Sequence, residues 1–275
     1  MIRWIQHLVF SNIVISVGAA ALLFFAFQLK GMPNDLVSIG FIFFSTLFMY
    51  NLQRMHKMGY QKLNLENARH RWINSNEKSI RILIIFSGLT VGSLTLLFSF
   101  DRIFMLGGLG VISFLYSYQS KLGNLRSIPG TKIFWIAFVW SVTIFALTLD
   151  NFHPDKEDWL LLLYNFIFIL AITIPFDIRD IDYDEEDYKT IPQLIGVKAS
   201  RILSFVLIGV AFVILSLLLQ NYSIFLSLIY GIFALLCLFS TPSRKELYYS
   251  GIMDFTISIS AISLYMYLHI SFFHF

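Results

Sequence analysis

The sequence has 275 residues, of which 57% are hydrophobic and only 13% charged, and its mean hydropathy is +0.72. A soluble domain of this length needs more charge to cover its surface, so the composition argues against one. It indicates instead an all-α integral membrane protein that crosses the bilayer several times. The single cysteine, Cys237, lies in an apolar stretch and excludes an intrachain disulfide.

Nine apolar segments approach the length needed to cross about 30 Å of hydrocarbon, and they place residues 1–275 in a single polytopic membrane domain. The first is too long for the core of a signal peptide, so we expect it to remain as a span. In chain order the predicted spans are 8–29, 36–53, 80–100, 103–119, 131–149, 158–176, 201–220, 223–240 and 251–272.

The lysines and arginines fall almost entirely on one side of these spans. With a cytoplasmic N-terminus, every basic residue except Lys30, Arg102 and Lys156 lies on the cytoplasmic side. This asymmetry follows the positive-inside rule and predicts that the C-terminus lies on the opposite side of the membrane. The two longest loops, 54–79 and 177–200, then face the cytoplasm, and such loops are where function is expected.

Basic residues gather in two of the predicted cytoplasmic loops. They are Arg54, Lys57, Arg69 and Arg71 in the first long loop, and Lys121 and Arg126 in YSYQSKLGNLRSIPG at 116–130. Taken singly, each is typical of a topology determinant. Together they provide the cations that an anionic ligand on this side requires.

The sixth span ends in PFDIRDIDYDEEDYKTIPQLIG at 175–196, where acidic residues are densely packed. If the helix continues past Pro175, then Asp177, Asp180, Asp184 and Asp187 lie on one face. Carboxylates on adjacent turns at a helix C-terminus are destabilised by mutual repulsion and by the helix dipole, and a bound hard cation removes both problems. Oxygen ligands favour Mg²⁺ before Ca²⁺. A hydrated acidic loop is the alternative interpretation.

This stretch resembles the second aspartate-rich motif of the UbiA superfamily of intramembrane prenyltransferases. Asp177, Asp180 and Asp184 match its D-x-x-D-x-x-x-D core, and they are followed by a T-x-P element at 190–192 and by Gly196. The segment LYSYQSKLGNLRSIPG at 115–130 is similar to the tyrosine-rich end of the family's fourth span and the basic loop after it.

The resemblance implies a UbiA-like helical barrel around a membrane-embedded cavity. It implies that Asp177, Asp180 and Asp184 hold Mg²⁺ and act in catalysis. The diphosphate of a polyprenyl substrate would be bound by Asn51, Arg54, Tyr116, Lys121 and Arg126. The partners expected are therefore a polyprenyl diphosphate, a lipophilic acceptor and the lipid bilayer, and no nucleic acid.

This chain departs from the family's first aspartate-rich motif. In YNLQRMHKMGYQ at 50–61, Asn51 matches the leading asparagine, but Leu52, Met55 and Gly59 stand at the three aspartate positions. The segment is cationic instead. The protein would then hold one Mg²⁺ with Arg54 and Lys57 replacing a second metal, use a substrate for which one metal suffices, or bind its ligand without transfer.

The leading functional hypothesis is Mg²⁺-assisted transfer of a prenyl group from a polyprenyl diphosphate to an aromatic or other lipophilic acceptor within the membrane. One alternative is a catalytically degenerate homologue that binds a lipid diphosphate or a quinone-like ligand. A less favoured alternative is a secondary transporter, since the second and sixth spans each lead into a long loop. Asp254, near the start of the ninth span, is expected at the membrane interface.

Overall fold

The computed structural model describes residues 3–60, 68–117, 128–149, 153–181 and 189–270, and within these ranges the chain is helical and has no β-strand. The prediction of an all-α protein is therefore confirmed. In chain order the elements are α1 (Arg3–Phe10), α2 (Ile13–Leu29), α3 (Leu36–Tyr60), α4 (Ala68–Ser75), α5 (Glu77–Thr95), α6 (Phe100–Ser117), α7 (Lys132–Thr148), α8 (Lys156–Asp180), α9 (Ile191–Ile195), α10 (Val197–Leu218), α11 (Ile224–Leu238), a π-helical turn η2 (Tyr248–Met253) and α12 (Asp254–His269).

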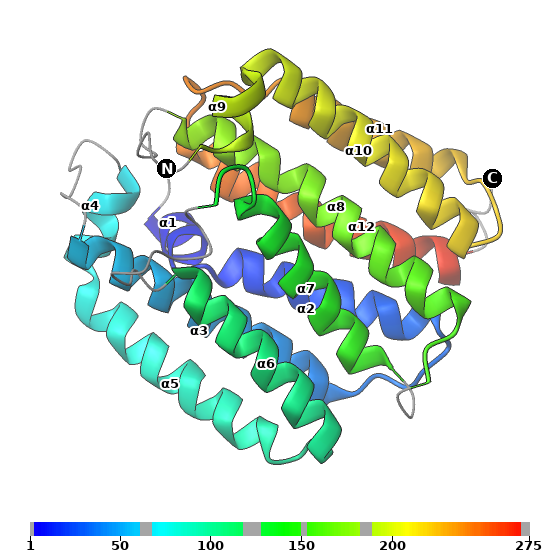
Figure 1. The fold of residues 1–275 in the computed structure, drawn as a ribbon, viewed down its shortest axis with the longest axis horizontal. Helices are drawn as coiled ribbons and strands as arrows, with labels where there is room; N and C mark the ends of the chain where they lie inside the picture. The colour runs from blue at the N-terminus through cyan, green and yellow to red at the C-terminus, as the bar shows by residue number, and fades with distance from the viewer. Residues whose placement is uncertain (1–2, 61–67, 118–127, 150–152, 182–188, 271–275) are drawn as a thin grey trace.

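The long helices lie side by side in one bundle (Figure 1). Helix α8 packs between α7 and α10, and α2 packs against α3 and α12. The short helices α1, α4 and α9 lie at one end of the bundle, and α12 runs from that end to the opposite one (Figure 1). The C-terminal ends of α3 and α8 and the start of α7 lie at the end with the short helices, so their charged residues can meet there.

The surface of the bundle is suited to a bilayer. Helix α5 exposes Ile82, Ile85, Phe86 and Leu89, which are large apolar side chains on its outer face. In the 18-residue apolar stretch of α5, 11% of the residues are buried inside the protein, and in that of α8, 56% are buried. Because a helix satisfies its own backbone hydrogen bonds, such an outer helix can present an apolar face to lipid, whereas α8 lies inside the bundle.

The count of nine spans stays a prediction. By length and composition, five helices in the described part of the chain can cross a membrane: those starting at Leu36, Glu77, Lys156, Val197 and Tyr248. The bent pair α1 and α2 makes a sixth if it is counted as one span. Helices α7 and α11 are apolar but shorter than the usual length of about 20 residues.

The first predicted span, 8–29, is not one straight helix. Helices α1 and α2 are bent by 61° at a break where Asn12 adopts a left-handed conformation with φ of 65°. Asparagine tolerates that conformation better than most residues do. The Asn12 side-chain amide donates to Asn51 Oδ1 at 2.9 Å, and Asn51 Nδ2 donates to the carbonyl oxygens of Ser11 and Leu47 at 2.9 and 2.8 Å. Asn51 therefore holds the break in place.

At the opposite end of the bundle, a buried ion pair joins the end of α2 to the start of α8. Lys30 after α2 pairs with Asp158 in the first turn of α8, and Lys30 Nζ also donates to the carbonyl oxygen of Thr148 at 3.0 Å. Asp158 belongs to a capping box as well, in which Asp155 Oδ1 accepts from the Asp158 backbone N–H at 2.9 Å and Asp158 Oδ2 accepts from the Asp155 N–H at 3.1 Å. These bonds tie α2, α7 and α8 together.

Replacing Lys30 by Met should destabilise the fold because it leaves the Asp158 carboxylate, 3% exposed, without its cation. Losing one partner of a buried pair costs about 3–5 kcal/mol. Arg81→Met, which breaks an exposed i,i+4 pair with Glu77, is the matched control and should cost about 0.3–0.5 kcal/mol. Thermal unfolding in detergent measures both, and equal losses in the two variants would contradict the structural role of Lys30.

Replacing Asp155 by Ala should cost about 1 kcal/mol of stability at pH 7, because the first turn of α8 loses its N-cap. The hydrogen bond from the Asp158 backbone N–H lowers the pKa of Asp155 below its usual value. A lowered folded-state pKa means that the cap stabilises fully above the unfolded-state pKa of about 3.9 and less as pH falls through the folded-state value. Unfolding measured from pH 7 into acid should show the deficit of Asp155→Ala shrinking, and a deficit independent of pH would contradict this account.

Candidate functional site

A cavity of about 1530 Å³ lies within the bundle. Most of its wall is apolar or aromatic and comes from α3, α6, α7 and α8, including Phe41, Phe48, Leu106, Trp135, Trp140 and Ile169. The charged lining residues lie in α4, near the C-terminal ends of α3 and α8, at the start of α7, and in the segment from Arg244 to the start of α12. These elements meet at the end of the bundle that carries α1, α4 and α9 (Figure 1). The cavity therefore joins an apolar chamber to a charged end, which matches a ligand with a lipophilic tail and an anionic head.

The charged end contains a buried ion pair between α7 and α8. Lys132 Nζ lies 2.6 Å from Asp177 Oδ1, and the Asp177 side chain is 1% exposed. Both residues line the cavity. Asp177 comes from the last turn of α8, which continues through Pro175 to Asp180, as the sequence spacing required.

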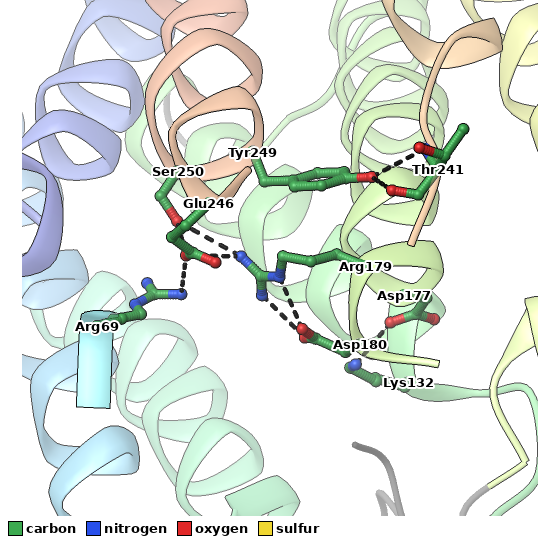
Figure 2. Close-up of polar contacts among 9 residues, drawn as sticks. All are labelled: Arg69, Lys132, Asp177, Arg179, Asp180, Thr241, Glu246, Tyr249 and Ser250. Carbon is green, nitrogen blue, oxygen red and sulfur yellow. Dashed lines mark hydrogen bonds and ion pairs between the residues drawn. The ribbon is translucent and has the colours of Figure 1, made fainter. Parts of the chain in front are cut away.

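One turn further along α8, Asp180 is held by its neighbour Arg179. Arg179 Nε donates to Asp180 Oδ1 at 2.7 Å and its terminal Nη2 donates to Asp180 Oδ2 at 2.8 Å. This two-pronged pairing fixes the plane of the carboxylate. Asp180 lies beside Asp177 and Lys132 in Figure 2. These three residues and Arg179 all line the cavity.

The other side of the Arg179 guanidinium reaches the segment that precedes the last helix. Its Nη1 donates to Glu246 Oε1 at 3.1 Å and to Ser250 Oγ at 3.4 Å, and Ser250 Oγ donates to the same Glu246 oxygen at 2.5 Å. Arg69 of α4 donates to Glu246 Oε1 from the opposite side at 3.2 Å (Figure 2). The network thus connects α4, α8 and η2.

Two aromatic rings pack against the guanidinium at the centre of this network. The Arg179 guanidinium carbon lies 5.2 Å from the centre of the Phe176 ring and 5.7 Å from that of Tyr249. The Tyr249 hydroxyl donates to the Thr241 carbonyl oxygen at 2.6 Å and accepts from the Thr241 N–H at 3.0 Å (Figure 2). Burial lowers the pKa of the Arg69 guanidinium, and the Glu246 carboxylate opposes that shift.

Three of the residues predicted to bind diphosphate are described. Arg54 and Tyr116 line the cavity, and Arg54 Nη1 donates to the carbonyl oxygen of Phe10 at 2.7 Å. Asn51 is 0% exposed and all its described hydrogen bonds go to the α1–α2 break and to α3. Lys121, Arg126 and Asp184, and the side chain of Lys57, lie outside the described residues.

The chemistry and placement of Asp177 and Asp180 suit a hard cation such as Mg²⁺. They are hard oxygen donors from adjacent turns and line one cavity. Within the described ranges no group of three or more His, Cys, Asp or Glu residues is close enough to hold a metal ion. Mg²⁺ is commonly bound by one or two carboxylates, with substrate phosphates and water completing its shell, so the two aspartates fit.

The sequence did not identify several of the residues that form this site. Lys132 is one of many basic residues on the predicted cytoplasmic side, Glu246 follows two basic residues in the chain, and Asp254 is expected from the sequence at the membrane interface. In the structure all three line the cavity, and Asp254 is 7% exposed. No local pattern marks them, because only the packing of α4, α7, α8 and η2 brings them together.

The fold is similar to solved structures of UbiA homologues. One from Archaeoglobus fulgidus, bound to GPP and Mg²⁺, is 11% identical with a TM-score of 0.60, over 96% of this chain and 100% of that one. One from Aeropyrum pernix K1 is 14% identical with a TM-score of 0.58, over 94% and 95%. A digeranylgeranylglyceryl phosphate synthase is 14% identical with a TM-score of 0.55, over 96% and 98%.

No curated protein sequence matches this chain significantly. The model of the UbiA prenyltransferase family matches residues 63–247, which is more than half of the chain and includes both Lys132 and the α8 carboxylates. The apolar helices agree with the integral membrane location of such a protein. The chain belongs to the UbiA prenyltransferase family.

Proposed function

We propose that this protein transfers a prenyl group from a polyprenyl diphosphate to an aromatic or other lipophilic acceptor within the membrane. The observation that carries the proposal is the two-part cavity, in which Lys132, Asp177, Arg179 and Asp180 form a charged end to an otherwise apolar chamber. An isoprenoid tail suits the chamber and a diphosphate suits the charged end. The solved homologue bound to GPP and Mg²⁺ supports a prenyl diphosphate as the donor.

Asp177 and Asp180 would hold Mg²⁺, together with Asp184, which lies outside the described residues. When bound, the ion would supply positive charge to the leaving diphosphate and so assist cleavage of the C–O bond. The electron pair of that bond leaves with the diphosphate, and the acceptor captures the allylic cation.

The protein's own cations would act at the same place. Lys132, Arg179, Arg69 and Arg54 all line the cavity, and Lys132 and Arg179 are fixed by their carboxylate partners. Preorganised charges in a site that excludes water stabilise developing negative charge strongly because they need not reorient during the reaction. In the proposed assignment, Lys121, Arg126 and Tyr116 complete the diphosphate site, while Asn51 shapes it by holding the α1–α2 break.

The nine-span barrel, with a cytoplasmic N-terminus and the C-terminus on the other side, is part of the proposal. Each predicted span overlaps a helix of the bundle, including α6, α7 and α11. Helix α12 ends at the end of the bundle opposite α1 (Figure 1), which supports termini on opposite sides. The charged end of the cavity would then face the cytoplasm.

A second candidate function is ligand binding without transfer. It is favoured by α3, whose cavity-lining residues near its C-terminal end include Leu52, Gln53 and Arg54 and, within the described residues, no carboxylate. A protein of this kind would bind a lipid diphosphate or a quinone-like molecule and release no diphosphate with any acceptor.

Asp180→Asn should reduce Mg²⁺-dependent consumption of geranyl diphosphate on the order of 100-fold or more, because the variant loses a carboxylate ligand of the Mg²⁺ that would neutralise the leaving diphosphate. Asp177→Asn should do the same, and its thermal stability must be checked because it removes the buried partner of Lys132. The control is Asp101→Asn, an exposed carboxylate in the first turn of α6 that does not line the cavity. Unchanged turnover in both site variants would overturn the assignment of the metal ligands.

Arg179→Lys should lower kcat/KM for geranyl diphosphate on the order of 100-fold. A lysine ammonium group cannot make the paired hydrogen bonds to Asp180 and the third to Glu246 that the planar guanidinium makes. Arg81→Lys, in an exposed pair with Glu77, is the matched control and should leave turnover unchanged. Steady-state kinetics of folded protein measures the difference. Wild-type kcat/KM in Arg179→Lys would show that the orientation of Asp180 does not depend on the guanidinium.

A further inference from the structure

Asp254 is a buried carboxylate from the last helix of the bundle. It opens α12 directly after the π-helical turn η2, its residue is 7% exposed, and it lines the cavity. Charged side chains at membrane depth are costly and usually face a cavity or a partner. The placement of Asp254 therefore indicates a functional role.

The hydrogen bonding of Asp254 differs from that of the other acidic residues that line the cavity. Asp177 pairs with Lys132, Asp180 pairs with Arg179, and Glu246 accepts from two arginines. Asp254, by contrast, makes no hydrogen bond and no ion pair with any side chain or backbone group in the described part of the chain. A carboxylate so deeply buried and without such bonds has its oxygens available to a ligand in the cavity.

The π-helical turn sets the depth of Asp254. Ser250, one turn earlier on the same helix, belongs to the Arg179 and Glu246 network at the charged end. Asp254 therefore lies one turn further into the bundle, and Ile257, which also lines the cavity, follows it toward the apolar chamber. Wider turns of this kind are frequent at functional sites, where they redirect a side chain.

The charged and titratable groups near Asp254 come from several elements. Arg69 of α4, Arg179 of α8, Glu246 before η2 and Tyr50 of α3 interact with it electrostatically at longer range. The first three belong to the network that closes the charged end. Asp254 thus lies between the diphosphate end and the apolar chamber, which is where the reacting carbon of a prenyl diphosphate must lie if the head and tail are placed as proposed above.

We propose that Asp254 is the general base that takes the proton from the acceptor. This inference rests on the proposed function, because prenylation replaces a hydrogen of the acceptor. The allylic C–O bond breaks and its electron pair leaves with the diphosphate. The acceptor oxygen or ring carbon then bonds to the allylic carbon and gives its proton to the Asp254 carboxylate. No oxidant or reductant is required. A positioned base contributes about 10²–10⁴-fold.

Asp254→Asn tests this role with two readouts on the same preparation. Transfer is measured from geranyl diphosphate to 4-hydroxybenzoate and to a glycerol-phosphate lipid, and diphosphate release is measured without any acceptor. The variant should lose transfer on the order of 100-fold or more and keep the acceptor-independent release, because breaking the C–O bond needs no base. Asp254→Glu should recover part of the transfer, and Asp101→Asn should match wild type.

The possible outcomes separate the two proposals. Normal transfer in folded Asp254→Asn, or a parallel loss of acceptor-independent release, would overturn the role of Asp254 and leave prenyl transfer intact. If the wild-type protein forms no product with any acceptor of the panel, the proposed function fails and the base role fails with it.

A labelling experiment tests the placement of Asp254 without turnover. Dicyclohexylcarbodiimide reacts with protonated carboxyl groups in apolar surroundings, and peptide mass spectrometry locates the adduct. We expect an adduct on Asp254 that geranyl diphosphate suppresses. The labelling is carried out at pH 5, so that the carboxyl group is protonated. Absence of this adduct from folded wild-type protein under that condition would show that the group is not accessible from the cavity, which would also overturn the proposal.

Discussion

The site depends on one guanidinium group with a carboxylate on each side. Arg179 binds Asp180 on its own helix and Glu246 before the last helix, and Arg69 binds Glu246 from a third direction. An unpaired charge in this buried position would cost several kcal/mol, so the pairing requires α4, α8 and η2 to meet at the charged end of the cavity. The same contacts orient Asp180, and they leave Asp254 one turn deeper, facing the apolar chamber.

Among the described cavity-lining residues of α3, Arg54 is the charged one. The family's first aspartate-rich motif would add carboxylates there, but Leu52 and Met55 occupy two of those positions and Arg54 lines the cavity instead. Fixed side-chain cations can stabilise a diphosphate without a second metal ion, provided that they are held in place before the substrate binds. Lys132, held by Asp177, and Arg179, held by Asp180, meet that condition. Under the proposed function, the altered first motif is then a change in how charge is supplied.

The sequence predicted features that depend on local pattern. Apolar length predicted the helices, and the three-residue spacing placed Asp177 and Asp180 on adjacent turns of a helix that continues through Pro175. It did not predict the break at Asn12, because that break depends on hydrogen bonds to Asn51, 39 residues away. For the same reason the sequence could not assign Glu246 or Asp254 to the site, since their roles arise from contacts between distant helices. The sequence predicted that acidic and basic residues gather on one side of the membrane. It did not predict which of them form ion pairs with each other.

Binding of geranyl diphosphate, compared with geraniol, tests the central claim most directly. The two ligands share a tail, and only the first has the anionic head that the charged end is proposed to hold. Titration of the purified protein in detergent with Mg²⁺ should show saturable binding of geranyl diphosphate that inorganic diphosphate competes away, and much weaker binding of geraniol. Equal affinity for the two ligands, or no competition by diphosphate, would contradict a diphosphate site formed by Lys132, Asp177, Arg179 and Asp180.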